Sequence, residues 1–203
     1  MIAVVDYGVG NIRSVLFALR RLNADAKLTG EPGEIAAASG VVLPGVGAFA
    51  PAMDSLRASG LAEPVRAAAS AGTPLLGICL GHQLLFSKSE EHGVHAGLHL
   101  LEGSVRRFPP GPKVPHMGWN EVRQVRESPL FDGIADGAFF YFAHSYFTEP
   151  ADAAVTIGVT DYGGDFACAV GRDNVFGTQF HPEKSGPVGL RMLANFCRLC
   201  GEQ

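Results

Sequence analysis

Apolar positions in the first eighty residues follow two alternating patterns. Short uninterrupted apolar runs at Ile2–Val5, Val41–Leu43 and Thr73–Ile78 are typical of buried strands. Helical spacing of apolar residues is found between these runs, at Asn11–Leu22, Pro51–Arg57 and Ala62–Ala71. Strands that alternate with helices in this way predict a parallel sheet covered by helices on both faces.

The second half of the chain consists of short β-rich runs separated by turn residues such as Tyr162-Gly163-Gly164-Asp165. These runs lie at Ser104–Phe108, Asn120–Val125, Ala138–Ala143, Ala154–Val159, Phe166–Gly171 and Val175–Phe180. They predict an antiparallel or mixed extension of the same sheet, and a helical pattern from Pro187 to Leu199 follows them. With no repeat or linker in the sequence, we expect one α/β domain over residues 1–203. The domain is expected to have three layers, with helices on both faces of a mostly parallel, twisted sheet.

Composition narrows the class of protein. The 203 residues suffice for one domain with a sizeable core. Hydrophobic residues make up 47% and charged residues 18%, the profile of a soluble globular protein. With a net charge of −4, the chain lacks the excess of basic residues that is typical of proteins that bind nucleic acid or an anionic membrane. No apolar run approaches the roughly 20 residues of a membrane-spanning helix, and the start of the chain has no charged signal-peptide region.

Cysteine and histidine usage points to the cytoplasm and to no bound metal. The four cysteines do not form a regular disulfide framework. Cys197 and Cys200 form a single CxxC inside an apolar-periodic helical segment, which is weak support for zinc. His92, His95 and His99 lie in a polar stretch and are expected to be solvated. We therefore expect neither a metal site nor another cofactor.

Cys79 lies where a buried strand is predicted to end and a helix to begin, between Gly77 and Gly81. Gly-x-Cys-x-Gly is the thiol counterpart of the nucleophile elbow, in which a strained turn exposes the reactive side chain. The start of the following helix favours the thiolate. A buried structural cysteine in a glycine-containing turn is the alternative.

A candidate base follows a later strand. His181 is succeeded by Pro182 and Glu183, and the proline biases His181 towards an extended conformation. Imidazole and carboxylate should then emerge beside each other, with His181 as the base and Glu183 orienting it. Taken alone, His181 also fits a surface histidine at a strand end.

The segment Pro44-Gly45-Val46-Gly47 directly follows a buried strand of the parallel half. Ligands of such sheets collect at the carboxyl ends of the strands, where Cys79 should also lie. Backbone amides of Gly45 and Gly47 are therefore candidate donors to an oxyanion, although a plain tight turn is the alternative. Together these groups favour acyl transfer from an amide through a thioester. A thiol peptidase would need a long open cleft, which nothing in the sequence indicates.

These motifs together resemble the class I (triad) glutamine amidotransferases. That family combines a GxCxGxQ elbow, an upstream PGxG-type loop and a late His-Pro-Glu, and all three occur here in the same order, with Gln83 in place. The resemblance implies a flavodoxin-like core, attack of Cys79 on the side-chain amide of L-glutamine, a γ-glutamyl thioester and release of ammonia. It also implies an oxyanion and substrate site made by Gly45, Val46, Gly47, Leu80, Gln83, His144, Ser145 and Tyr146.

Over nearly its whole length the chain is similar to one branch of that class, the glutaminase subunits of imidazole glycerol phosphate synthases. The markers are residues 6–11 (DYGVGN), 115–120 (PHMGWN), 141–146 (YFAHSY) and 181–185 (HPEKS). The resemblance implies a heterodimer with a separate (βα)8-barrel cyclase subunit. That subunit would use the ammonia to make imidazole glycerol phosphate and aminoimidazole carboxamide ribonucleotide in histidine biosynthesis. An interface or ammonia gate is implied at Asn11, Trp119, Tyr141 and Lys184.

Several alternatives stay open at this point. Trp119 and Tyr141 also fit ordinary core aromatics, and Lys184 fits a solvated charge. His82 departs from the family, which usually has methionine there, and it can alter packing or the thiol pKa without removing a triad member. Two other classes of protein fit the same motifs. The first is a glutaminase of another pathway, such as aminodeoxychorismate or pyridoxal phosphate synthesis, and the second is a non-catalytic regulatory protein on the same fold. The second of these predicts a broken triad, yet Cys79, His181 and Glu183 are all present.

Overall fold

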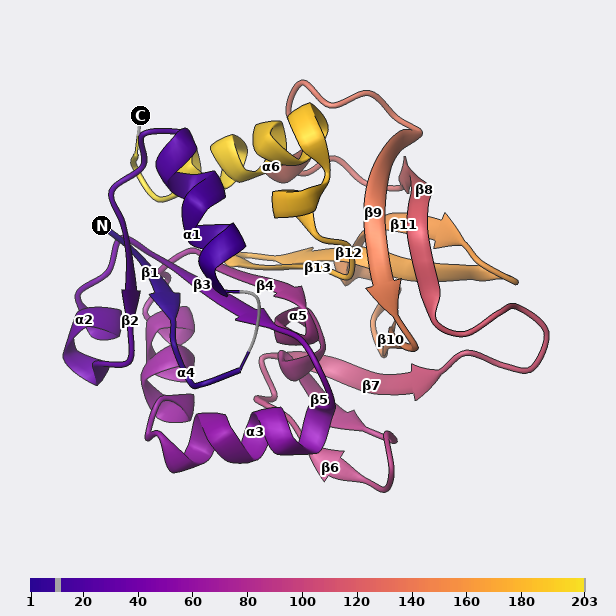
Figure 1. The fold of residues 1–203 in the computed structure, drawn as a ribbon, viewed down its shortest axis with the longest axis horizontal. Helices are drawn as coiled ribbons and strands as arrows, with labels where there is room; N and C mark the ends of the chain where they lie inside the picture. The colour runs from indigo at the N-terminus through magenta and orange to yellow at the C-terminus, as the bar shows by residue number, and fades with distance from the viewer. Residues whose placement is uncertain (10–11, 203) are drawn as a thin grey trace.

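A computed structural model describes residues 1–9 and 12–202, whose strands build one mixed sheet with helices on both faces (Figure 1). The helices are α1 Ile12–Arg21, α2 Pro32–Ala36, α3 Phe49–Ala58, α4 Ala62–Ser70, α5 Leu80–Leu84 and α6 Gly186–Leu199. The first strands are β1 Ile2–Val5, β2 Ala26–Thr29, β3 Gly40–Gly45, β4 Leu75–Cys79, β5 Phe86–Ser89 and β6 His95–Ala96. The later strands are β7 Leu101–Arg107, β8 His116–Gln124, β9 Ala138–His144, β10 Tyr146–Pro150, β11 Thr156–Asp161, β12 Asp165–Arg172 and β13 Val175–Thr178.

The sheet has a parallel half and a mostly antiparallel half. Its order is β2-β1-β3-β4-β13-β12-β10-β7-β5-β6, and strands β2 to β13 of this order pair in parallel. From β13 onward the pairs β13–β12, β12–β10 and β10–β7 are antiparallel. The β8–β9 hairpin joins through β11 and rises at one end of the sheet (Figure 1). The predicted α/β class with an antiparallel extension is confirmed.

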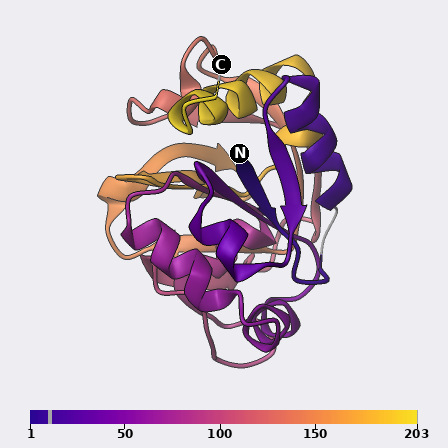
Figure 2. The ribbon, with the colours of Figure 1, turned by 90° about the vertical axis from the view of Figure 1, so that its left-hand side faces the viewer.

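The central strands are apolar on both sides because both faces are covered by helices. In β1, Ile2 and Val4 belong to the hydrophobic cluster under α1 and α6, whereas Ala3 and Val5 belong to the cluster under α2 to α5. Figure 2 shows the two helical layers on opposite sides of the sheet. This alternation explains why the sequence has continuous apolar runs there rather than a polar-apolar repeat.

Predicted and observed elements differ mainly where strands are short. The helix expected to begin after Cys79 is short: α5 ends at Leu84, and Phe86 begins β5, which pairs with β7. Strands β2, β5, β6 and β10 and helix α2 were not predicted. In β2, for example, exposed Lys27 interrupts the apolar pattern because the strand lies at the edge of the sheet. Short edge strands carry little periodic signal.

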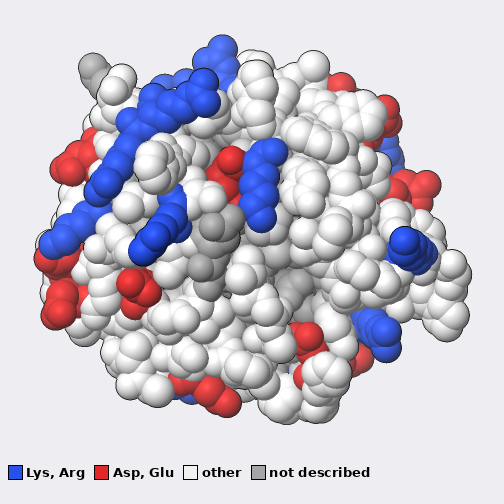
Figure 3. Space-filling view, in the orientation of Figure 1, with Lys and Arg blue, Asp and Glu red and all other residues white. Residues whose placement is uncertain are grey.

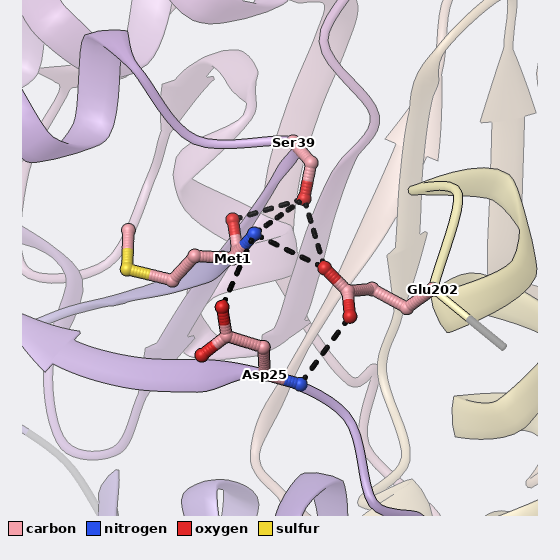
Figure 4. A network of polar contacts seen from close by, with 4 residues as sticks. All are labelled: Met1, Asp25, Ser39 and Glu202. Atoms are coloured by element: carbon pink, nitrogen blue, oxygen red, sulfur yellow. Dashed lines mark hydrogen bonds and ion pairs between the residues drawn. The ribbon is translucent and has the colours of Figure 1, made fainter.

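The first and last described segments of the chain lie side by side. The amino group of Met1 donates to Ser39 Oγ at 3.1 Å and to Glu202 Oε1 at 3.0 Å (Figure 4). Asp25 Oδ2 lies 3.7 Å from the same amino group. This network joins β1 to the end of the chain after α6.

Among the described helices, none has the length and apolar character required to cross a bilayer.

Candidate active site

Cys79 is the last residue of β4 and immediately precedes α5. Its φ of 54° lies in the left-handed region, a strained conformation for a residue with a side chain. The flanking glycines permit the turn. A Cβ at Gly81 would lie 1.8 Å from the Leu43 carbonyl oxygen, and one at Gly77 would lie 2.8 Å from the His82 nitrogen. Only glycine therefore lets the first turn of α5 pack this closely on β3 and β4.

His181 follows β13, the parallel neighbour of β4. Thr178 pairs with Ile78 in this register, so the chain brings His181 to the end of β4, close to Cys79. The imidazole Nδ1 lies 2.8 Å from Glu183 Oε1, and both side chains are buried. The structure thus places the three predicted catalytic side chains together.

The environment of His181 favours its protonated form. Burial lowers the pKa of His181, but hydrogen bonding to Cys79 and Glu183, together with their charges, outweighs burial and raises that pKa to about 9. The imidazolium so favoured places a positive charge beside Cys79.

Hydrogen bonds from β9 fix the backbone around His181. Its N–H donates to the Tyr141 carbonyl at 2.9 Å. Ser185 Oγ donates to the His181 carbonyl at 2.6 Å and accepts from the Tyr141 N–H at 3.0 Å. The base is therefore held by β9, one of the two strands of the β8–β9 hairpin.

A pocket of about 520 Å³ opens above Cys79 and His181. Its lining includes these predicted site residues: Val46, Gly47, Cys79, Leu80, Gln83, His144, Ser145, Tyr146, His181 and Lys184. Glu183 lies behind His181, and Gly45, Trp119 and Tyr141 do not line the pocket. Asn11 lies outside the described residues. The pocket is large enough for an amino acid the size of glutamine.

The segment 44–47 borders the pocket on the β3 side. Gly45 pairs with Cys79 in the β3–β4 register, and a Cβ there would lie 2.6 Å from Tyr7 Oη. That hydroxyl donates to the Pro44 carbonyl at 2.7 Å. Gly47 has a φ of 103°, which favours glycine. Val46 and Gly47, rather than Gly45, face the cavity.

Gln83 and a neighbouring glutamine connect the pocket wall to the thiol. Gln83 Nε2 donates to the Tyr146 carbonyl at 2.9 Å and to Gln179 Oε1 at 3.0 Å. Gln179 Nε2 donates to Cys79 Sγ at 3.8 Å. Gln179 was not predicted as a site residue, because a single glutamine inside a buried strand end has no distinguishing signal.

Two charged residues at the pocket were also missed. Glu91 is buried, and its Oε2 accepts from the Phe49 N–H at 2.7 Å, which anchors the start of α3 beside segment 44–47. Arg107, at the end of β7, lines the same pocket and is exposed. Neither residue belongs to a motif. Arg107 reaches the cavity because β7 pairs with β10, where Arg107 lies opposite Tyr146, and Glu91 lies just beyond the end of β5.

The outer surface beside the pocket is aromatic and apolar. Trp119 is 57% exposed, which rejects the core-aromatic alternative for that residue. Its ring meets the half-buried ring of Tyr141 edge-on at 6.1 Å, and Lys184 Nζ lies 5.9 Å above the Tyr141 ring. Met117 and Phe139, on the same hairpin, are also exposed.

Within residues 1–9 and 12–202, no group of three or more His, Cys, Asp or Glu side chains is arranged so that it could hold a metal ion. Cys197 and Cys200 are buried and reduced, with Cys197 in α6 and Cys200 at its end.

Comparison with known proteins identifies the family. The family model "Glutamine amidotransferase class-I" matches residues 3–200. The chain is 57% identical to the imidazole glycerol phosphate synthase subunit HisH of Moorella thermoacetica, covering 98% of this chain and 94% of that protein. It is 52% identical to the HisH subunit of Desulfitobacterium hafniense, covering 100% and 96%.

Solved structures of lower identity share the fold. PurLQS from Thermotoga maritima matches with a TM-score of 0.76 at 20% identity, covering 98% of this chain and 96% of that one. The glutaminase domain of Trypanosoma brucei CTPS, with bound acivicin, matches with a TM-score of 0.73 at 18% identity, covering 100% and 94%. The chain belongs to the class I glutamine amidotransferases and, within them, to the family of HisH subunits of imidazole glycerol phosphate synthase.

Proposed function

We propose that this chain is the glutaminase subunit of imidazole glycerol phosphate synthase and hydrolyses L-glutamine to glutamate and ammonia. The observation that carries the proposal is the meeting of Cys79 and His181 at the floor of a pocket of amino-acid size, with Glu183 hydrogen-bonded to His181 behind them. Full-length similarity to HisH subunits supports the same function.

The reaction begins when the Cys79 thiolate attacks the side-chain amide carbon. A C–S bond forms, and the carbonyl oxygen becomes an oxyanion for which backbone amides of segment 44–47 and Leu80 are the proposed donors. The His181 imidazolium gives its proton to the amide nitrogen, and ammonia leaves as the C–N bond breaks. Glu183 keeps the imidazole oriented and stabilises its charge.

Water completes the cycle. His181, now neutral, takes a proton from the water as it attacks the γ-glutamyl thioester, and the C–S bond breaks. Glutamate leaves, and the thiolate–imidazolium pair is restored. No redox or cofactor step is needed for this balance of atoms and charge.

Charges at the pocket suit the zwitterionic end of glutamine. We assign the carboxylate of Glu91 to the α-ammonium group and the guanidinium of Arg107 to the α-carboxylate, since both line the cavity. Gln83, His144, Ser145 and Tyr146 complete the substrate site in this proposal. Such contacts fix the amide over Cys79, which is the positioning that accelerates its attack.

The partner in this proposal is a (βα)8-barrel cyclase subunit, joined in a heterodimer. Supporting it, Met117, Trp119 and Phe139 form an exposed apolar group beside the pocket, with Lys184 and Tyr141 at its border. Aromatic side chains of this kind are typical anchors of interfaces. Ammonia released under such a cover would reach the partner rather than bulk water.

A cationic surface adjoins this region. Lys and Arg side chains gather over α1 (Figure 3), where Arg13, Arg20 and Arg21 border a hollow beside exposed Phe17. The proposal therefore includes an acidic surface on the partner. We further propose that residues 1–203 act as one domain and that the enzyme works in the cytoplasm in histidine biosynthesis. The four free cysteines support a reducing compartment.

The first test measures glutamate release with and without the cyclase and its nucleotide substrate. Wild type should be slow alone and strongly stimulated in the complex. Cys79→Ser should reduce release by at least about 10³-fold while partner binding is retained, because the weaker oxygen nucleophile replaces the thiolate.

Cys197→Ser serves as the matched control, because Cys197 is a buried cysteine of α6 away from the pocket. Its glutamate release should equal that of wild type. Turnover by Cys79→Ser at the wild-type rate would remove Cys79 from the mechanism. Rapid turnover without the partner would contradict gating by the complex.

A further inference from the structure

A directed chain of hydrogen bonds runs from β8 to the glutamine pocket. His144 Nδ1 lies 2.8 Å from the Tyr146 carbonyl oxygen, and a carbonyl only accepts, so this nitrogen carries the hydrogen. Burial is the main reason that the pKa of His144 falls to about 3, so the ring is neutral. Its Nε2 therefore bears a lone pair.

His116 supplies the donor for that lone pair. Its Nδ1 lies 2.9 Å from His144 Nε2 and must carry a hydrogen. Burial lowers the pKa of His116 to about 4, so its own Nε2 is an acceptor at neutral pH. Asn120 Nδ2 lies 3.3 Å from that nitrogen.

The orientation of Asn120 is fixed in turn by the backbone. Its Nδ2 also donates to the Asp161 carbonyl at 3.0 Å, and its Oδ1 accepts from the Glu121 N–H at 2.9 Å. Reversing this amide would place a donor against an N–H and an acceptor against a carbonyl. Both imidazoles are consequently held in the tautomer with hydrogen on Nδ1.

The other end of the chain sets which atom Gln83 offers to a substrate. The Tyr146 carbonyl accepts from both His144 and Gln83, and the second hydrogen on Gln83 Nε2 goes to Gln179. Both donors of Gln83 are therefore used by the protein, and its Oε1 remains to accept from the substrate. Gln179 then donates to Cys79 Sγ.

We propose that His116 is a positioning residue for the glutaminase reaction: through His144 it holds the Tyr146 carbonyl and the Gln83 amide in the orientation that binds glutamine beside Cys79. This inference rests on the proposed function. His116 does not line the pocket and touches no substrate. Its ring is held by stacking between Tyr162, at 3.9 Å, and Phe142, at 4.7 Å.

The kinetic test uses His116→Phe, which keeps an aromatic ring in that stack but has no donor. With the full chain assembled with its cyclase, KM for glutamine should rise about tenfold while kcat changes less than about threefold. His116→Asn keeps an N–H donor near the position of Nδ1, and it should restore KM to within about threefold of wild type.

Phe166→Leu is the matched control, since Phe166 packs against both His116 and His144 but has no polar group. It should lower Tm and leave KM unchanged. A KM for His116→Phe no higher than that of Phe166→Leu, or no rescue by His116→Asn, overturns the inference. A wild-type complex that releases no glutamate would instead overturn the proposed function.

A second measurement does not depend on activity or on the variants folding. In ¹⁵N-labelled wild type at pH 7, the ring nitrogens of His116 and His144 should both show the neutral Nδ1–H tautomer. A neutral Nε2–H tautomer, or an imidazolium, at His116 would overturn the inference even if the kinetic effects were seen.

Discussion

His82 shows how a single polar side chain is accommodated next to the nucleophile. The ring is fully buried, and its Nε2 lies 3.0 Å from Thr148 Oγ1. That hydroxyl donates to the Ala167 carbonyl at 3.3 Å, so it accepts from His82. His82 Nδ1 is buried with no hydrogen-bond partner among residues 1–9 and 12–202. Space for the ring exists only because residue 177 is glycine, where a Cβ would lie 2.2 Å from Nδ1.

Replacing His82 by methionine should therefore stabilise the protein. An unsatisfied buried acceptor costs about 1–3 kcal/mol, and methionine fills a similar space without one, so we expect a gain of about 1 kcal/mol at pH 7. Burial lowers the pKa of His82 to about 3, well below its ordinary value of 6.5. Because the unfolded chain binds the proton more readily, stability is lost as pH falls from about 6.5 towards 3.

The advantage of His82→Met should accordingly widen by up to about 2 kcal/mol between pH 7 and pH 5. Urea unfolding at both values measures it. An equal difference at the two pH values would show that His82 is not buried in its neutral form.

At the scale of elements, the β4–α5 turn depends on close backbone contact. Gly45 in β3, Gly77 in β4 and Gly81 in α5 leave no room for side chains where the three elements meet. Sequence reasoning placed the turn correctly because glycines flank a cysteine between a strand and a helix pattern. The same residues do not show where α5 ends, because the pairing of Phe86 with Leu101 of β7 cannot be read from residues 81–86 alone.

Gly81→Ala should disturb this turn. Its Cβ would lie 1.8 Å from the Leu43 carbonyl oxygen and 2.7 Å from the Leu43 carbonyl carbon, and backbone cannot rotate away as a side chain can. We expect a loss of about 3 kcal/mol or more in unfolding free energy and displacement of Cys79. Thermal unfolding and glutamate release measure the two effects. Gly33→Ala in α2, where nothing lies within 4 Å, should leave both unchanged, and equal behaviour of the two variants would contradict the packing argument.

At the scale of the whole molecule, contacts between distant segments close the fold. The Met1 amino group, Asp25, Ser39 and Glu202 join β1, β2 and the end of the chain (Figure 4). The hydrogen bond to Glu202 is the main cause that raises the pKa of the amino group, and the same contact lowers the pKa of Glu202. The ion pair therefore contributes to stability between about pH 4.5 and pH 8.0. These are the ordinary pKa values of the carboxylate and the amino group, and between them both groups are charged in the unfolded chain.

Glu202→Gln should lower stability by less than about 1 kcal/mol near pH 6.5, because the pair is partly exposed. The difference from wild type should shrink above pH 8, where the unfolded amino group is neutral, and below pH 4.5, where the unfolded carboxylate is protonated. Tm values at three pH values measure it. Glu127→Gln, at an exposed carboxylate, controls for the change in net charge. A pH-independent difference would mean that the ion pair does not contribute.

The sequence alone determined the predicted cysteine–histidine chemistry and the class of fold, because both depend on local patterns of residues. Flanking glycines mark Cys79, a proline and a carboxylate mark His181, and continuous apolar runs mark strands buried on both faces. Tertiary structure decided which buried polar groups meet. Strand pairing brings together the segments that carry Glu91, Gln179 and the His116–His144 pair, and no local sequence pattern predicts that pairing. A buried polar atom needs a hydrogen-bond partner, and the partner can come from a distant strand. The orientations of these side chains therefore follow only from the folded chain.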